Sequence, residues 1–223
     1  PKSLSFAWKA PKRSGDIVLS VSDLEFGFDE DRPLWPPLSF TLHRGQKVGL
    51  LGRNGCGKST LLKLIRGELT PTRGEARLGT GVKPAYFAQH MTDLLREEGT
   101  VLGEMRRMCE EGTTEEAMRF ALGTFMLGEE FWTSRVAELS GGERTRLLLA
   151  WAFISGGNFL ILDEPTNNLD LESRQALIRA IDEFQGTVLT VAHDRYLLQE
   201  GVSELWMLRS DGLHAVFGDV GNL

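Results

Sequence analysis

The spacing of apolar residues changes along the chain, and each change predicts a different element. Apolar and polar positions roughly alternate over residues 17–28 and again over residues 38–42, and a turn at Arg44-Gly45 follows. A period of two is typical of a strand with one buried face. The first part of the chain therefore predicts an antiparallel β layer.

Further along, short apolar strands alternate with helical patterns. The predicted helices cover residues 61–66 and 141–155, and Leu177, Ile181 and Phe184 share one face of a third. The predicted strands cover residues 47–51, 75–78, 83–87, 159–162 and 187–192, with a last β pair around Trp206 and Val216. Strands that alternate with helices usually form a parallel sheet. The sequence thus predicts an α/β fold with a parallel-sheet core.

Residues 91–135 depart from this pattern, because Met, Glu and Arg dominate there and β-branched residues become rare. Thr113-Thr-Glu-Glu116 has the spacing of a capping box, which marks a helix start. We therefore expect a small helical lobe, at about residues 91–140, inserted in the core.

Composition and charge limit the class of protein. The 223 residues are 41% hydrophobic, enough to bury one core. The longest apolar run, Leu147–Ile154, is far shorter than the ~20 residues of a membrane span, and no signal peptide is evident, so a soluble, cytoplasmic protein is expected. A net charge of -6 argues against a protein that coats nucleic acid by bulk electrostatics. Cys56 and Cys109 are expected to be free thiols in a reducing compartment.

The first 16 residues differ from the rest of the chain. They contain Pro and Ser without periodicity, lack an initiator Met, and carry basic residues ahead of the first acid, Asp16: Lys2, Lys9, Lys12 and Arg13. We expect residues 1–16 to be the end of a linker in a longer polypeptide, followed by a folded domain over residues 17–223.

A glycine-rich turn after the predicted strand 47–51 carries the first candidate chemistry. Its sequence is Gly52-Arg53-Asn54-Gly55-Cys56-Gly57-Lys58-Ser59-Thr60, with the spacing G-x4-G-K-S. Glycines permit a positive φ, so consecutive N–H groups can turn toward phosphate oxygens at a helix N-terminus. Lys58 is expected to reach the β- and γ-phosphates and Ser59 to bind Mg²⁺. The segment predicts a nucleotide phosphate site with Gly52, Asn54, Gly55, Cys56, Gly57 and Thr60 as further binding residues.

Two carboxylates, Asp163 and Glu164, follow the predicted strand 159–162. Ligands of an open α/β sheet bind at the carboxyl ends of its strands. Asp163 is expected to hold Mg²⁺ through water, and Glu164 to orient and deprotonate the attacking water. Acidic residues also occur at the ends of buried strands without any catalytic role. The phosphate loop in the same chain is therefore the main reason to expect a catalytic role for Asp163 and Glu164.

The stretch Leu139-Ser140-Gly141-Gly142-Glu143 opens the predicted helix 141–155. Ser140 and Glu143 have capping-box spacing, and a glycine-rich helix N-terminus is also an anion site. Together with the phosphate loop and the two carboxylates, this stretch resembles the signature sequence of ATP-binding-cassette (ABC) ATPases. The resemblance implies a P-loop NTPase fold of ABC type that hydrolyses ATP with Mg²⁺. In that family, the signature residues of one domain bind the γ-phosphate held by another domain's phosphate loop.

The resemblance covers about residues 17–217 and includes four more positions. Gln89 is similar to the family's Gln that senses Mg²⁺ and the attacking water, and His193 to the switch histidine that contacts the γ-phosphate. Asp170 lies where the family has a loop across the domain interface. Phe28 stands where the family more often has a Tyr against adenine, and stacking needs only the ring face. Each has a plain alternative: a solvated loop residue, a strand-end histidine, a helix N-cap and a core side chain, respectively.

Within the family, three segments resemble ABC-F proteins, soluble tandem ATPases that act on ribosomes and include translation factors and antibiotic-resistance proteins. These are Gln89-His90 followed by Asp93-Leu94, the run Glu164–Asp170, and His193-Asp194-Arg195. The resemblance implies the second ABC domain of such a protein, paired head-to-tail with another ABC domain and acting on the ribosome.

Three other classes of nucleotide-binding protein are rivals to this interpretation. The nucleotide-binding subunit of an ABC transporter would share every catalytic residue and remains the alternative. A chromosome-maintenance ATPase would need a long coiled coil between Gln89 and Leu139, and that stretch is too short for one. A non-hydrolysing nucleotide switch would be expected to lack Glu164 or His193, and both are present.

Overall fold

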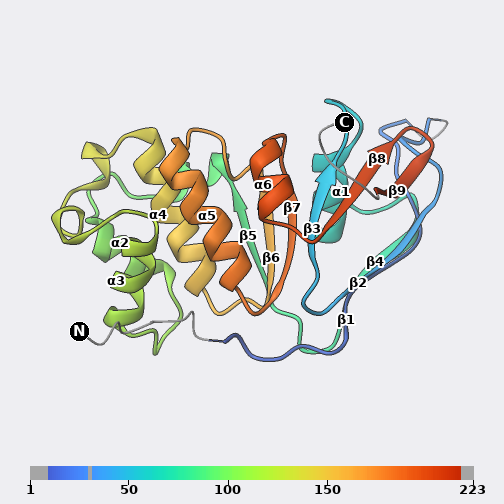
Figure 1. Ribbon diagram of the computed structural model, residues 1–223. Helices are drawn as coiled ribbons and strands as arrows, with labels where there is room; N and C mark the ends of the chain where they lie inside the picture. Colours follow the sequence, from blue (N-terminus) through green and yellow to red (C-terminus); the bar gives the residue numbers. More distant parts are fainter. Residues whose placement is uncertain (1–9, 30–31, 217–223) are drawn as a thin grey trace.

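The computed structural model describes residues 10–29 and 32–216, which form two sheets with helices packed around them (Figure 1). The larger sheet has the order β5 (Pro84–Ala88), β6 (Phe159–Asp163), β7 (Thr187–Val191), β3 (Lys47–Leu51), β8 (Glu204–Arg209) and β9 (Gly212–Val216). Its strand pairs are parallel except β8 with β9. The predicted parallel-sheet core and final β pair are confirmed.

The smaller sheet is antiparallel, as predicted, and has the order β2 (Leu38–His43), β1 (Ile17–Glu25) and β4 (Arg73–Leu78). The structure thus adds to this layer a strand that follows the phosphate loop in the sequence. Register shifts interrupt the pairing of β1 with β2 between Ile17 and Leu19 and between Val21 and Leu24. Such irregularities explain why the alternation of β1 is only rough.

Helices cover both faces of the larger sheet and one end of the molecule (Figure 1). The helices are α1 (Lys58–Ile65), α2 (Val101–Met108), α3 (Glu115–Thr124), α4 (Gly141–Ile154), α5 (Leu171–Glu183) and α6 (Arg195–Glu200), with short 3-10 turns η1 (Gln89–Leu94), η2 (Glu129–Phe131) and η3 (Val136–Glu138). The predicted capping box of α4 forms: the Glu143 N–H donates to Ser140 Oγ at 3.2 Å, and the Ser140 N–H donates to Glu143 Oε2 at 2.9 Å.

The predicted start of α3 is wrong by one residue. Thr114, and not Thr113, is the N-cap, and its hydroxyl oxygen accepts from the Ala117 N–H at 3.2 Å. The Thr113 N–H instead donates to Glu110 O at 3.1 Å, in a turn that contains Gly112 at φ 89°. This turn keeps Thr113 outside the helix, so the predicted capping box with Glu116 does not form.

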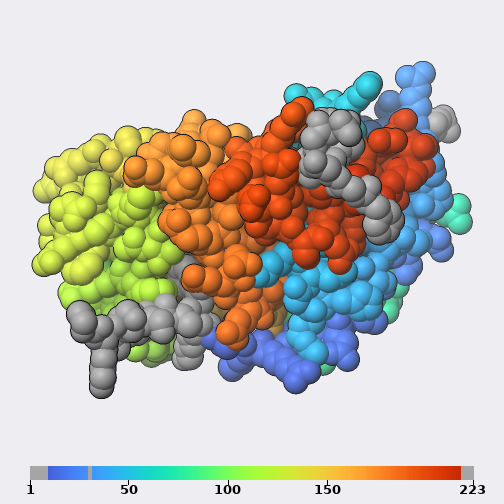
Figure 2. Space-filling model, in the orientation of Figure 1, coloured from blue at the N-terminus to red at the C-terminus, as the bar shows by residue number. Residues whose placement is uncertain are grey.

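Helices α2 and α3 lie together beside α4, at the end of the molecule away from the smaller sheet (Figure 1). Figure 2 shows the same order on the surface, with α2 and α3 at one end, α5 and α6 in the middle and β1 and β2 toward the other end. This placement accords with the predicted helical lobe. The limits of the lobe and the division at residue 16 remain predictions, and Lys2 and Lys9 of the predicted linker lie outside the described residues.

The position of β6 in the sheet explains why residues 159–162 form an unbroken apolar run in the sequence. Phe159 and Ile161 belong to the cluster that also contains residues of α1 and the smaller sheet, whereas Leu160 and Leu162 belong to the cluster with α4 and α5. All four side chains are buried, because helices or strands cover both faces of the sheet. The next residue, Asp163, ends the strand at the edge where parallel strands present ligand sites.

Candidate functional site

The phosphate loop, residues 52–60, connects β3 to α1. Gly55 and Gly57 have φ angles of 79° and 100°, as predicted for this turn. Gly57 is the N-cap of α1, and the first intrahelical bond joins the Leu61 N–H to Gly57 O at 2.8 Å. The N–H groups of residues 58–60 therefore have no acceptor within the helix. Such N–H groups bind anions, phosphate above all.

The loop also needs glycine for reasons of space. A Cβ on Gly57 would lie 2.0 Å from the ring of Trp35, and one on Gly52 would lie 2.5 Å from Cys56 Sγ. The φ of Gly52 is not positive, so the loop requires a small residue there and not a special backbone angle. Lys58 is 7% exposed, and its ammonium donates to Gly52 O at 2.7 Å and to Arg53 O at 3.1 Å. Cys56, like Cys109, is a free thiol, as predicted.

An open pocket of about 520 Å³ lies beside the start of α1 and is lined by Ser59, Ala88, Gln89, His90, Thr92, Asp163, Glu164 and Asn167. Sheet topology explains why these residues meet: β5 and β6 are neighbours, and Ala88, directly before Gln89, pairs with Asp163. The pocket therefore gathers the three predicted Mg²⁺ ligands, Ser59, Gln89 and Asp163. A hydroxyl, an amide oxygen and a carboxylate suit a hard cation that keeps part of its hydration shell.

The two carboxylates of the pocket lie in surroundings that disfavour their charge. Burial raises the pKa of Asp163, and burial together with the neighbouring Asp163 raises the pKa of Glu164. His193 Nε2 lies 3.2 Å from Glu164 Oε1. Glu164 has a φ of 50°, and its N–H donates to Val191 O at 2.8 Å, which ties it to the end of β7. A cation bound in the pocket would offset the cost of burying both charges.

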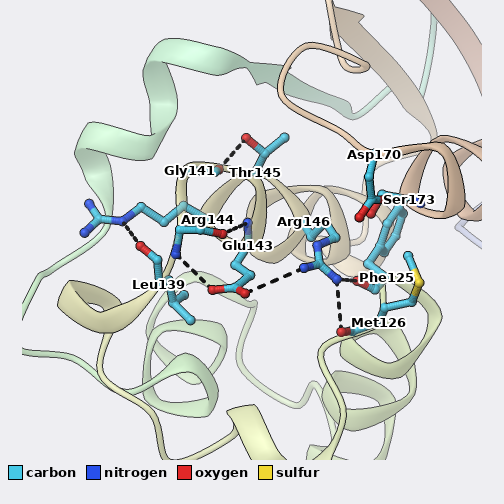
Figure 3. A network of polar contacts seen from close by, with 11 residues as sticks. Phe125, Met126, Leu139, Gly141, Glu143, Arg144, Thr145, Arg146, Asp170 and Ser173 are labelled. Carbon is cyan, nitrogen blue, oxygen red and sulfur yellow. Dashed lines mark hydrogen bonds and ion pairs between the residues drawn. The ribbon is translucent and has the colours of Figure 1, made fainter.

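The signature residues form a second group at the N-terminus of α4, where Figure 3 shows Leu139, Gly141 and Glu143. None of Ser140, Gly141 and Gly142 lines the pocket. A Cβ on Gly142 would lie 2.8 Å from Asn168 O, so glycine lets the loop after Glu164 approach α4. A Cβ on Gly141 would meet nothing within 4 Å. Gly142 therefore has a packing role in addition to any role in binding.

Asp170 lies near this second group (Figure 3). It is the N-cap of α5 and accepts from the Ser173 N–H at 2.8 Å. Hydrogen bonding with the Ser173 side chain, and then with its N–H, lowers the pKa of Asp170, and the charge of Arg146 on α4 adds to the effect. Arg146 also donates to Phe125 O at 3.3 Å and to Met126 O at 3.1 Å, so one guanidinium links α4 to the end of α3 and acts on Asp170. The N-cap alternative for Asp170 is confirmed, and its role at an interface remains a prediction.

The side chain of Phe28 lies on the surface and belongs neither to the pocket nor to the signature group. It is 75% exposed, and its ring meets that of Phe26 edge-on at 5.2 Å between centroids. The alternative that Phe28 is a core residue is therefore wrong. Its ring is accessible to a planar ligand, and its predicted contact with adenine remains untested.

Comparison with known proteins agrees with this geometry. A model of the family described as "ABC transporter" matches residues 36–167, more than half of the chain. The chain belongs to the ABC ATPase family. The matched segment contains the phosphate loop, Gln89, the signature residues and both carboxylates of this ABC domain. A solved structure described as the ATP-binding subunit of an ABC transporter has a TM-score of 0.76 and 25% identity to the domain, and covers 92% of this chain and 91% of that one.

Curated relatives of the ABC domain are longer proteins. "Probable ATP-binding protein YheS" of Escherichia coli O6:H1 is 39% identical over 215 residues, which are 96% of this chain and 33% of that protein. "ABC transporter F family member 5" of Arabidopsis thaliana is 39% identical over 207 residues, 92% of this chain and 30% of that protein. The chain thus spans about a third of the length of these relatives. The predicted resemblance to ABC-F proteins is confirmed. Among the described residues, no helix is long and apolar enough to cross a membrane.

Several residues that contact the site of this ABC domain were not among its predicted residues: Trp35, Tyr86 and the pocket-lining Ala88, His90, Thr92 and Asn167. Trp35 lies beneath Gly57, His90 lines the pocket, and the Tyr86 hydroxyl donates to Asp163 Oδ2 at 3.3 Å. Burial, with the charge of Asp163, raises the pKa of Tyr86 to about 12, so this hydroxyl keeps its proton at neutral pH. Tyr86 could have been found from its place in β5, because Gln89 directly follows that strand. Trp35 gave no comparable signal.

Proposed function

We propose that this ABC domain binds ATP in the pocket beside the phosphate loop and hydrolyses it with Mg²⁺. The observation that carries the proposal is the convergence of Ser59, Gln89, Asp163 and Glu164 in one pocket, with His193 within 3.2 Å of Glu164. Glycine-rich N–H groups, an ammonium, oxygen ligands and a carboxylate base are the parts that phosphoryl transfer to water requires.

In this proposal each residue has one task. The N–H groups of the phosphate loop and the Lys58 ammonium bind the phosphates, while Ser59, Gln89 and Asp163 hold Mg²⁺. Bound Mg²⁺ would neutralise charge on the phosphate oxygens. Glu164 accepts a proton from the attacking water, and His193, which lies against its carboxylate, contacts the γ-phosphate. The exposed ring of Phe28 stacks on adenine, and Ser140, Gly141 and Gly142 serve the site of a second ABC domain, with Asp170 at the interface.

The Lys58→Ala variant tests the phosphate assignment. It deletes a charge-assisted contact worth roughly 1.5 to 3 kcal/mol, so ATP affinity is expected to fall at least about tenfold in isothermal titration calorimetry. Lys63→Ala is the matched control, because Lys63 lies on the same helix and is exposed. Wild-type affinity in the Lys58 variant would contradict the assignment of the phosphate loop.

We further propose that the domain is the second ABC domain of a cytoplasmic ABC-F protein that acts on the ribosome as a translation factor or antibiotic-resistance protein. Two observations support this: a relative at 39% identity is named as an F family member, and the chain spans about a third of the relatives it matches. The nucleotide-binding subunit of an ABC transporter is the alternative, supported by the structural likeness to such a subunit.

Sedimentation through a sucrose cushion distinguishes these two proposals. The intact polypeptide, with Glu164→Gln and the matching change in its other ABC domain, is expected to sediment with ribosomes in ATP and to remain above the cushion in ADP. ATP held without hydrolysis would keep the two domains closed. Recovery in a membrane fraction, with no association with ribosomes in either nucleotide, would favour the transporter alternative.

A further inference from the structure

Tyr86 joins two strands at the edge of the pocket. It lies on β5 opposite Ile161 of β6, and its half-buried side chain reaches along the sheet to Asp163, where the hydroxyl donates to Oδ2 at 3.3 Å. A carboxylate held at one oxygen loses freedom to rotate and presents its other oxygen in a fixed direction. The contact therefore acts on the one carboxylate among the three predicted Mg²⁺ ligands.

The guanidinium of Arg66 lies over the face of the Tyr86 ring. Its guanidinium carbon lies 3.3 Å from the centre of the Tyr86 ring, and its Nη2 pairs with Glu68 Oε1 at 2.6 Å. Arg66 is the C-cap of α1, the helix whose N-terminus follows the phosphate loop. A cation over an aromatic face is attractive, and a cation at a helix C-terminus is favourable as well. One end of α1 thus carries Ser59, and the other end fixes the ring that touches Asp163.

We propose that Tyr86 is a positioning residue for the Mg²⁺ site: its hydroxyl sets the orientation of the Asp163 carboxylate, and Arg66 fixes the Tyr86 ring. This inference rests on the proposed function, because it assigns residues that support the same site. Groups that orient a metal ligand commonly change metal affinity by 10- to 100-fold, because a ligand that is already oriented loses less freedom on binding. The Tyr86 hydroxyl is expected to act at the lower end of that range.

The alternative is that Tyr86 only packs against the core, since its ring adjoins the cluster that contains Phe159 and Ile161. Tyr86→Phe separates the two roles, because it keeps the ring and the contact with Arg66 and removes only the hydroxyl. A packing role predicts no change in metal affinity. A positioning role predicts weaker metal binding at an unchanged melting temperature.

The test measures binding of Mn²⁺, a paramagnetic substitute for Mg²⁺, by electron paramagnetic resonance on ATP-saturated protein. We expect Tyr86→Phe to weaken Mn²⁺ affinity about tenfold, while ATP affinity in EDTA and melting temperature stay at wild-type values. Tyr196→Phe is the matched control: the chain has two tyrosines, and Tyr196 is 45% exposed. Arg66→Met, which removes the cation and keeps an apolar chain over the ring, is expected to weaken Mn²⁺ affinity in the same direction by a smaller factor.

Two results would overturn the inference in distinguishable ways. Wild-type Mn²⁺ affinity in Tyr86→Phe would reject the positioning role and leave the proposed function intact. Absence of a Mn²⁺ site in the wild-type protein with ATP bound would reject the metal site itself, and with it both proposals.

Discussion

Replacing Glu164 by Gln is expected to lower the rate of ATP hydrolysis by about 10²- to 10⁴-fold and to leave ATP binding intact. Glutamine keeps the size of the side chain and its ability to hydrogen-bond but cannot accept a proton from water. The surroundings of Glu164 support this role, because His193 Nε2 lies 3.2 Å from its carboxylate, and its backbone has a φ of 50° and a hydrogen bond from its N–H to Val191 O. Residues at sparsely populated angles persist where the surrounding structure fixes them.

The measurement is single-turnover hydrolysis of ATP together with nucleotide affinity by calorimetry. Glu183→Gln is the matched control, since that exposed carboxylate ends α5 and does not line the pocket. Thermal unfolding should show no loss of stability in Glu164→Gln, because burial raises the pKa of Glu164 and thus favours an uncharged side chain there. Turnover within a factor of about two of wild type would remove Glu164 from its proposed role.

The second large effect depends on a partner domain. The isolated chain should bind ATP, but its rate of ATP hydrolysis should be about 10²- to 10³-fold lower than that of the same domain joined to a second ABC domain. The reason is geometric. Ser140, Gly141 and Gly142 do not line the pocket of their own chain, so under the proposed function the donors that stabilise charge on the γ-phosphate come from a second ABC domain.

Turnover per site, measured for the isolated domain and for the domain joined to a second ABC domain in one polypeptide, tests this expectation. Within the joined protein, Gly142→Asp should lower hydrolysis strongly, because the added side chain would collide with Asn168 O and place a negative charge at the donors. ATP affinity of the phosphate loop in the same chain should not change. Gly123→Ala is the matched control, since a Cβ there meets nothing within 4 Å. Equal turnover by the isolated and joined domains would contradict a shared site.

Local patterns predicted those features that depend on near neighbours in the chain. The apolar run before Asp163 predicted a buried strand, and β6 is one. The glycines of the phosphate loop were expected to allow positive φ angles, and Gly55 and Gly57 have them, whereas Gly52 does not. The Ser140 capping box formed as the spacing indicated, because its donors and acceptors lie within one turn of helix. The predicted helix start at Thr113 was wrong for an equally local reason. Thr113 belongs to a turn that contains Gly112, so the next residue, Thr114, is the helix N-cap.

Contacts across the fold were decided by the tertiary structure alone. The sequence and its family resemblance predicted Ser59, Gln89 and Asp163 as Mg²⁺ ligands, but only the pairing of β5 with β6 beside α1 brings them into one pocket. It left open whether Phe28 is core or surface, since an aromatic residue near a strand end fits either, and packing left the ring 75% exposed. Trp35 and Arg66 gave no motif, and Tyr86 offered only its place in the strand before Gln89, because the contacts of all three are with residues distant in sequence. Spacing along a chain fixes backbone angles and periodic faces, whereas a ligand site depends on which strand ends become neighbours.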